Sequence, residues 1–309
     1  MEKIAIIGSG LIGRAWACVF ARAGHPVVIW DNVPAAMPAA LKLIEESLVE
    51  MKRVGLINED PRVIATRVRA VPTLEEAVRD ADYVQENTSE NLEIKRAVYQ
   101  QMDAAAPPHC ILASSTSTIQ TSRFSENLKG RNRCIVAHPV NPPHVIPVVE
   151  VSPAPWTDAQ VVEKTRALHA KVGQVPIIVK REVEGFILNR LQAALLNEAW
   201  RLVKEDFVSA EDLDKTIKDG LGLRWSFMGP FETIDLNAPG GIPDYAKRYG
   251  PKLQGMMGDV KYVPWDDPLI AKINSEWRRV MPHEKHAERE AWRDQRLMAL
   301  IAHKRGQPK

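Results

Sequence analysis

The chain opens on a short apolar run that ends in a glycine-rich turn, and this feature constrains the fold more than any other. Lys3–Ile7 reads as a strand buried on both faces, and the hexapeptide Gly8-Ser9-Gly10-Leu11-Ile12-Gly13 follows it with the form G-x-G-x-x-G. Leu11–Ala23 then has a helical apolar pattern, and Pro26–Trp30 is a second strand. A glycine turn between a buried strand and a helix is the context in which such a motif holds a dinucleotide.

Each glycine of the motif has a distinct physical task. Gly8 permits the tight turn, Gly10 lets a diphosphate approach the backbone, and Gly13 lets the helix pack closely on the strand. The first N–H groups of the helix are free to bind phosphate oxygens. Asp31 ends the second strand, where an acidic residue binds the adenosine ribose, and no arginine follows it to accept a 2′-phosphate. The sequence therefore predicts NAD rather than NADP.

Strand-like and helical segments alternate over the first 180 residues or so. The further strands are expected at Ala81–Glu86, Cys110–Ala113, Arg133–Ala137, Val148–Val151 and Pro176–Lys180, with helices at Pro34–Val54, Asn91–Met102 and Asp158–Val172. This alternation predicts an α/β fold with a Rossmann-type, doubly wound, mainly parallel sheet. The last short strands lack helical crossovers, so that edge is expected to be partly antiparallel.

Strand-like runs nearly vanish after Arg181. Helical patterns follow at Phe186–Lys204, Ala210–Asp219 (with Ser209 as its N-cap), Tyr245–Met257, Pro268–Arg279 and His283–His303. We therefore expect residues 1–182 to form an NAD-binding domain, and residues 183–309 to form an all-helical domain for substrate binding and dimerisation.

Composition excludes several classes of function. The 41 basic and 39 acidic residues give a net charge of +2, which predicts neither nucleic-acid binding nor a polybasic membrane patch. No apolar stretch reaches the ~18 residues that a membrane-spanning helix needs. The three cysteines are far apart and have no zinc-ligand spacing, which favours a reducing, cytoplasmic location and predicts no metal site.

Polar side chains follow three of the predicted strands, at Glu86–Lys95, Ser114–Thr118 and His138–Asn141. Ligands of open α/β sheets bind outside the carboxyl ends of the strands. A histidine such as His138 suits the proton transfer that accompanies alcohol oxidation. A hairpin-like return of the next strand would bring Glu150 beside it. Taken alone, a structural histidine and an exposed edge-strand glutamate remain open alternatives.

Several separated motifs, in matching order, resemble the 3-hydroxyacyl-CoA dehydrogenase family. They are Ala113-Ser114-Ser115-Thr116-Ser117-Thr118, Ala137-His138-Pro139-Val140-Asn141-Pro142-Pro143, Pro147-Val148-Val149-Glu150-Val151, Gly185-Phe186-Ile187-Leu188-Asn189-Arg190-Leu191 and Asn197-Glu198-Ala199-Trp200. The resemblance runs from about residue 3 to about residue 250.

The resemblance implies a role for each matching residue. His138 would be the general base, Glu150 its orienting partner, and Ser117 and Asn189 hydrogen-bond donors to the substrate oxygen. Asn141 would shape the pocket floor. The cofactor would be bound by Gly8, Gly10, Leu11, Ile12, Gly13 and Asp31, with Glu90 and Lys95 near its nicotinamide half and the substrate. Read singly, Ser117 could instead cap a helix, Asn189 could satisfy its own helix, and Glu90 and Lys95 could form a solvated face.

The resemblance also implies NAD-dependent oxidation of the 3-hydroxyl of a small 3-hydroxy acid, an activity of the EC 1.1.1 class, by a homodimer joined through its helical domain. L-Gulonate is the expected substrate, and Arg224 the candidate partner of its carboxylate, although Arg224 could equally stack on Trp225 or lie at a subunit contact.

Three alternatives remain open. A 3-hydroxyacyl-CoA substrate is weakened because Ser47 is followed seven places later by Val54 rather than a lysine. L-Carnitine would need aromatic faces, which Trp225, Phe227 and Phe231 could offer. A crystallin-like structural protein that binds NAD(H) without turnover is the third alternative.

Overall fold

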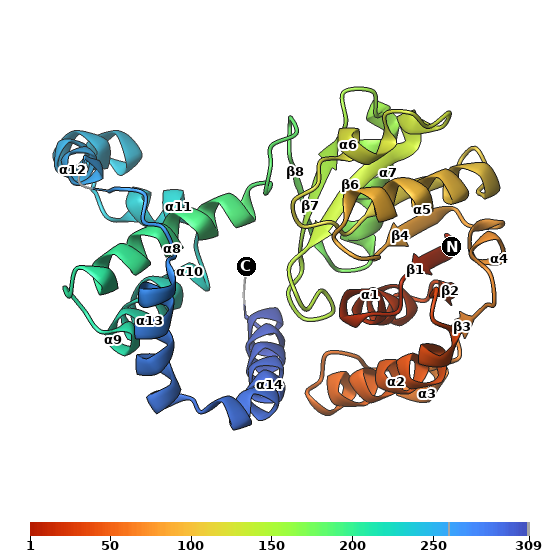
Figure 1. The fold of residues 1–309 in the computed structure, drawn as a ribbon, viewed down its shortest axis with the longest axis horizontal. Helices are drawn as coiled ribbons and strands as arrows, with labels where there is room; N and C mark the ends of the chain where they lie inside the picture. Colours follow the sequence, from red (N-terminus) through yellow and green to blue (C-terminus); the bar gives the residue numbers. More distant parts are fainter. Residues whose placement is uncertain (259, 308–309) are drawn as a thin grey trace. The chain divides into compact units, whose positions relative to one another are not determined.

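The computed structural model describes residues 1–258 and 260–307 (Figure 1). The described chain forms two compact units. The first contains Met1–Asn189 together with the chain from Ala291 on, and the second contains Arg190–Glu290. The C-terminal segment therefore belongs to the nucleotide-binding unit, although the sequence patterns place it with the helical part.

An eight-stranded sheet forms the centre of the first unit, in the order β3-β2-β1-β4-β5-β6-β7-β8. Strands β1 to β6 are parallel, β7 is antiparallel to β6, and β8 is parallel to β7. This is the expected doubly wound sheet with an antiparallel step near one edge. The strands are β1 Ile4–Ile7, β2 Val27–Trp30, β3 Val68–Ala70, β4 Tyr83–Glu86, β5 Ile111–Ser114, β6 Cys134–Pro139, β7 Val148–Pro153 and β8 Val175–Ile178.

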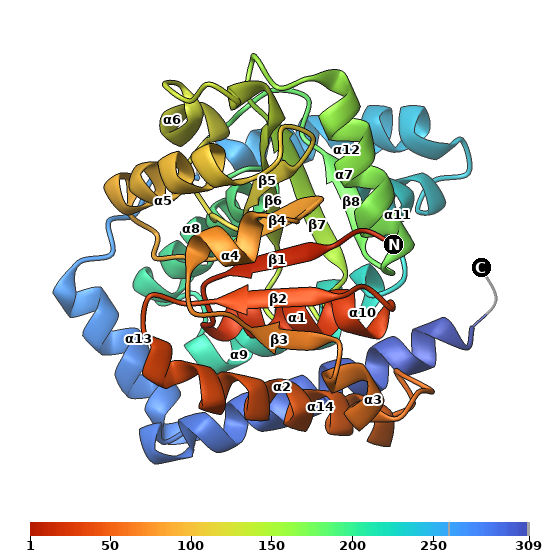
Figure 2. The ribbon, with the colours of Figure 1, turned by 90° about the vertical axis from the view of Figure 1, so that its right-hand side faces the viewer.

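Helices cover both faces of this sheet (Figure 2). Because side chains alternate along a strand, Ile4 and Ile6 pack toward one set of helices, whereas Ala5 and Ile7 pack toward the other. The first set is α1 Leu11–Arg22, α2 Met37–Arg53, α3 Pro61–Ala65 and α7 Ala159–Lys171. The second set is α4 Leu74–Val78, α5 Leu92–Ala105 and α6 Thr121–Ser125.

The last helix, α14 His286–Arg305, returns to the first unit and lies beside α2 (Figures 1 and 2). Met298 is 3% exposed and belongs to the same apolar core as α1 and α2, and Ile301 packs against that core. The Arg305 guanidinium donates to the Leu56 carbonyl oxygen. The tail is therefore part of the nucleotide-binding core.

The second unit contains helices and no strand among its described residues, as expected. Ser209 accepts a hydrogen bond from the Asp212 N–H and caps its helix as predicted, but the helix ends sooner and continues as one π-helical segment. The elements are α8 Leu188–Lys204, which begins in the first unit, α9 Ala210–Lys215, the π-helix Thr216–Leu221, α10 Gly222–Trp225, α11 Pro230–Leu236, α12 Gly241–Met257 and α13 Asp267–Val280. No described helix is long and apolar enough to span a bilayer.

The glycine turn gives a matched pair of stability predictions. A Cβ atom at Gly13 would lie 1.9 Å from the Gly8 carbonyl oxygen, whereas a Cβ atom at Gly10 meets nothing within 4 Å. Gly13→Ala should therefore lower the free energy of unfolding by about 1–3 kcal/mol, because the added Cβ atom forces α1 away from β1. Gly10→Ala should change it by no more than about 0.5 kcal/mol. Urea unfolding of both variants measures the difference, and equal losses would contradict the close approach of α1.

Candidate functional site

The glycine turn joins β1 to α1 and lies against the end of β2. Gly8 has φ +96°, a conformation that side chains disfavour, and its N–H donates to the Trp30 carbonyl oxygen. The Asp31 carboxylate accepts hydrogen bonds from the Ser9 N–H at 2.6 Å and the Ser9 hydroxyl at 2.8 Å. The acidic residue is thus held at the turn, where a ribose would approach it.

The N-terminus of α1 fits a diphosphate. Gly10 is the N-cap and offers no side chain to the first N–H groups, and the first turn carries no acidic residue. Leu11 is exposed, and the Arg14 guanidinium lies 3.4 Å from the Ser9 carbonyl oxygen, so a cation adjoins the turn. Open N–H groups, a helix dipole and an adjacent cation are suited to bind the diphosphate of NAD.

His138 and Glu150 face each other across the antiparallel step of the sheet. They are directly paired in the β6–β7 register, and the His138 Nδ1 atom lies 2.9 Å from the Glu150 Oε2 atom. Their side chains are 8% and 2% exposed. The predicted contact between the two side chains is therefore confirmed, and the alternative of an exposed edge-strand glutamate is wrong.

The second oxygen of Glu150 is held by backbone. Its Oε1 atom accepts from the Ile187 N–H at 2.8 Å and the Leu188 N–H at 2.9 Å, at the start of α8. Burial raises the pKa of Glu150, but the hydrogen bonds from His138 and from these two N–H groups outweigh it and bring the pKa below its usual value of 4.5. Because an ionised carboxylate only accepts, His138 donates through Nδ1, and no described side chain or backbone group forms a hydrogen bond with its Nε2 atom, which can accept a proton from a substrate.

Ser117 and Asn189 lie together near the end of β5. The Asn189 amide donates to the Ser117 carbonyl oxygen at 2.9 Å, so the first turn of α8 is tied to the hydroxyl-rich run. The Glu90 Oε1 atom accepts from the Ser117 N–H at 2.9 Å and the Thr116 hydroxyl at 2.6 Å. Burial raises the pKa of Glu90, but the Thr116 hydrogen bond and the Lys95 charge bring it below its usual value. Glu90 therefore fixes the backbone that presents Ser117.

Lys95 is not on a solvated face. Its side chain is 1% exposed, and its ammonium binds the Glu86 carboxylate at 3.0 and 3.1 Å, with Glu90 at 3.8 Å. Glu86 is 0% exposed and also accepts from the Ser114 hydroxyl. The solvated-face alternative is therefore wrong for Lys95. Its expected contact with the nicotinamide half of the cofactor stays a prediction.

Two further predicted site residues, Asn141 and Arg224, are exposed to solvent. Asn141 is exposed in the loop between β6 and β7, three residues after His138. Arg224 is exposed on α10 in the second unit. The glycines that precede it, Gly220 and Gly222, are both accommodated within helical backbone.

Sequence reasoning missed the supporting roles of Glu86 and Phe186. Glu86 ends β4 and lies in the polar segment Glu86–Lys95 that the sequence marked, but the sequence pattern does not show that Lys95 is its buried partner. Phe186 is fully buried, and its ring centroid lies 5.4 Å from that of His138. The glycine that precedes Phe186 was the available signal, because it suggests an unusual backbone turn.

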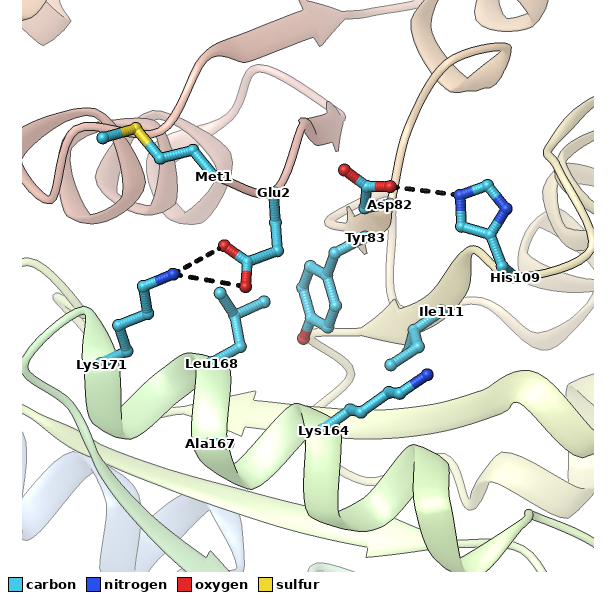
Figure 3. Close-up of a pocket in the computed structure, with 10 residues that line it drawn as sticks. All are labelled: Met1, Glu2, Asp82, Tyr83, His109, Ile111, Lys164, Ala167, Leu168 and Lys171. Atoms are coloured by element: carbon cyan, nitrogen blue, oxygen red, sulfur yellow. Dashed lines mark hydrogen bonds and ion pairs between the residues drawn. The ribbon is translucent and has the colours of Figure 1, made fainter.

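A cavity of about 490 Å³ lies at the opposite, amino-terminal ends of β1, β4 and β5 (Figure 3). Tyr83, Glu2, Asp82, His109 and Lys171 all line it. Lys171 forms an ion pair with Glu2 at 2.9 Å, and His109 forms a hydrogen bond with Asp82 at 3.1 Å. None of the predicted site residues lines this cavity. It is therefore separate from the cluster at the carboxyl ends of the strands.

The buried ion pair beneath the site gives a second prediction. Lys95→Met leaves the Glu86 carboxylate buried without its cation, so it should lower the free energy of unfolding by about 3–5 kcal/mol. The double variant Lys95→Met with Glu86→Leu should lose less than the sum of the single losses. Lys42→Met, in the exposed pair with Glu46, is the control and should change stability by no more than about 1 kcal/mol. Urea unfolding that gives equal losses for Lys95→Met and Lys42→Met would contradict the assignment.

Comparison with known proteins agrees with this geometry. The NAD-binding domain of 3-hydroxyacyl-CoA dehydrogenase matches residues 3–183, and the C-terminal domain of the same family matches residues 185–270. Rabbit (Oryctolagus cuniculus) lambda-crystallin is 38% identical over 98% of this chain and 96% of its own, and Pseudomonas putida L-carnitine dehydrogenase is 33% identical over 97% and 93%.

Among solved structures, the chain is similar to 5-formyl-3-hydroxy-2-methylpyridine 4-carboxylic acid 5-dehydrogenase, an NAD+-dependent dismutase. The TM-score is 0.87 and the identity 29%, over 100% of both chains. A glycine turn suited to a diphosphate, two family domains in order and full-length relatives all agree. The chain therefore belongs to the 3-hydroxyacyl-CoA dehydrogenase family and is an NAD-dependent oxidoreductase of the EC 1.1.1 class.

Proposed function

We propose that the chain oxidises the 3-hydroxyl group of a small, free 3-hydroxy acid, and that L-gulonate, giving 3-dehydro-L-gulonate, is its substrate. The observation that carries the proposal is the His138–Glu150 pair at the carboxyl end of β6. Glu150 binds Nδ1, so the Nε2 lone pair of a nearly buried imidazole is available to a substrate hydroxyl.

The residues of the site divide the work of the reaction. NAD, when bound, supplies the acceptor for the hydride that leaves C3. His138 takes the hydroxyl proton at Nε2 and becomes an imidazolium, which the Glu150 carboxylate stabilises through Nδ1. The Asn189 amide donates to the substrate oxygen as its charge develops and the C3–O double bond forms. The Ser117 hydroxyl joins it by turning away from the Glu90 Oε1 atom, to which it donates at 3.2 Å. In the reverse direction, the imidazolium returns its proton to the carbonyl oxygen.

The residues at two positions, one in α2 and one at its C-cap, favour a free acid over a coenzyme A thioester as substrate. Ser47, the residue at the coenzyme A-binding position, donates its hydroxyl to the Leu43 carbonyl oxygen of its own helix, and Val54 stands where a lysine would be needed. A lambda-crystallin relative is 38% identical to this chain, against 34% for a relative named 3-hydroxyacyl-CoA dehydrogenase with the same coverage of this chain, which supports the sugar acid over the thioester. Arg224 is the proposed partner of the carboxylate, through a bidentate guanidinium contact.

Two other substrates have specific support. L-Carnitine is favoured by the similarity to the Pseudomonas putida dehydrogenase and by the exposed aromatic side chains of Trp225, Phe227 and Phe231. The formyl pyridine carboxylate in the name of the structural relative is an aldehyde. It is favoured as a substrate because that relative matches this chain over the whole of both chains.

A protein that binds NAD(H) without turnover is the alternative of another class, and the intact His138–Glu150 pair argues against it.

One experiment separates these functions. NADH formation at alkaline pH is measured with L-gulonate, L-3-hydroxybutyrate, L-carnitine and 3-hydroxybutyryl-CoA. With the formyl pyridine carboxylate, loss of the aldehyde is measured instead, because a dismutase reoxidises the NADH that it forms. We expect turnover with L-gulonate and a fall in kcat of about 10²–10⁴-fold in His138→Gln, because the proton acceptor is lost. The NADH Kd, measured by fluorescence titration, should not change.

Each substitution at a proposed site residue has a control, in which a residue of the same type is changed outside the site. His109→Gln alters an exposed histidine at the opposite edge of the sheet and should leave kcat unchanged. Arg224→Gln should raise KM for L-gulonate at least tenfold, whereas Arg248→Gln, in the same unit, should not. Near-normal turnover by His138→Gln would exclude the proposed base. Tight NADH binding with no turnover of any substrate would favour the structural alternative.

We also propose that the protein is a cytoplasmic homodimer joined through its helical unit. The three cysteines are buried and unpaired, as in a reducing compartment. The helical unit exposes large apolar side chains, including Phe231 at 74%, Leu236 at 67% and Leu223 at 62%, which favour a protein partner.

Sedimentation equilibrium should give twice the chain mass of 34.6 kDa. Phe231→Asp should shift the protein toward the monomer, because it places a charge in an apolar contact. A monomeric wild-type protein at all concentrations would contradict the proposed dimer.

A further inference from the structure

Two consecutive residues, separated from the start of α8 by Ile187 alone, have left-handed backbone. Gly185 has φ +72° and Phe186 has φ +50°. The conformation is easy for glycine but strained for phenylalanine. Strained residues persist only where their surroundings enforce them, and they gather at functional sites. Phe186 is 0% exposed and belongs to the apolar core on the α4–α5 face of the sheet, which is what enforces the conformation here.

The backbone turn aims two donors at one atom. After Phe186 the chain presents the N–H groups of Ile187 and Leu188, which reach the Glu150 Oε1 atom at 2.8 and 2.9 Å. Successive N–H groups that converge in this way form a small anion-binding nest. Leu188 is also the first residue of α8, so the positive end of the helix dipole faces the carboxylate.

The side chain of Phe186 acts on the other member of the pair. Its ring lies at 5.4 Å and 37° to the His138 imidazole, so it covers one side of that ring. The Nδ1 atom of the same imidazole is fixed by the Glu150 Oε2 atom. One residue thus sets the direction of the donors to Glu150 through its backbone and restricts the plane of His138 through its ring.

Among the residues that the structure describes, no lysine or arginine pairs with Glu150 in place of the two N–H groups. The titratable group that faces Glu150 from β6 is His138, and β8 presents the apolar Ile177 at the paired position. The turn before α8 contributes backbone donors alone to the carboxylate. The charge of Glu150 therefore depends on these two hydrogen bonds and on His138.

We propose that Gly185-Phe186 is a positioning turn for the His138–Glu150 pair, in which the N–H groups of Ile187 and Leu188 hold Glu150 as a carboxylate and the Phe186 ring fixes the imidazole plane. The inference deepens the proposed function, since it concerns the same pair. Its first test does not depend on the identity of the substrate.

The backbone donors are tested by removing one of them. Leu188→Pro deletes a single N–H at the first helical position, where proline is well accepted. The pKa of Glu150 is followed by ¹³C NMR of glutamate-labelled protein, with Glu150→Gln used to assign the signal. We expect the pKa of Glu150 to rise by about one to two pH units. Gly185→Ala, which strains the same turn, should raise it as well and serves if Leu188→Pro does not fold.

The ring is tested by kinetics. Phe186→Leu should lower kcat about ten- to a hundredfold, because the proton acceptor is misplaced, with a smaller change in KM and an unchanged NADH Kd. Phe20→Leu is the matched control, since Phe20 is also 0% exposed but is a residue of α1 whose ring stacks on Trp16 rather than on His138. An unchanged pKa of Glu150 in the turn variants, or equal kcat values for Phe186→Leu and Phe20→Leu, would overturn the inference.

The two proposals fail in distinguishable ways. If His138→Gln retains turnover, the proposed base is wrong, but the titration of Glu150 still reports whether the turn holds its charge. If His138→Gln is inactive and the pKa of Glu150 does not respond to the turn, the base stands and the positioning turn is wrong.

Discussion

The rest of the site depends on the carboxylate of Glu150, which joins three parts of the chain. It comes from β7, binds His138 on β6 through one oxygen, and binds the N–H groups at the start of α8 through the other. Burying a carboxylate costs desolvation free energy unless its lone pairs accept hydrogen bonds. These partners are therefore required by electrostatics as well as by function. The Oε2 atom fixes the tautomer of His138, and the Oε1 atom fixes the position at which α8 begins.

The βαβ unit and the His138–Glu150 contact were predictable because their signals are local. The glycine turn specifies its own geometry, as the contact between Gly13 and the Gly8 carbonyl oxygen illustrates. The two strands of the pair are separated by a short loop without a helix, which forces an antiparallel return and brings residues twelve apart into register. The periodicities of strand and helix also located most of the long elements, although α8 begins at Leu188 rather than at Phe186, because Phe186 is left-handed.

Other features escaped the sequence because they depend on distant contacts. The edge strand β3 has three residues, too few to show a period. Lys95 looks like an ordinary surface lysine until Glu86 and Ser114 are brought around it by three neighbouring elements. Nothing in the charged sequence of α14 identifies Met298 as a core residue of a unit whose other strands and helices end more than a hundred residues earlier.

The return of α14 has a consequence for the order in which the protein is made. The ribosome completes the strands of the nucleotide-binding unit early, yet α14, whose Met298 belongs to the same apolar core, is synthesised only after the helical unit. Until α14 emerges, the nascent unit lacks part of its apolar core. That core therefore closes only after the intervening helical unit has been made.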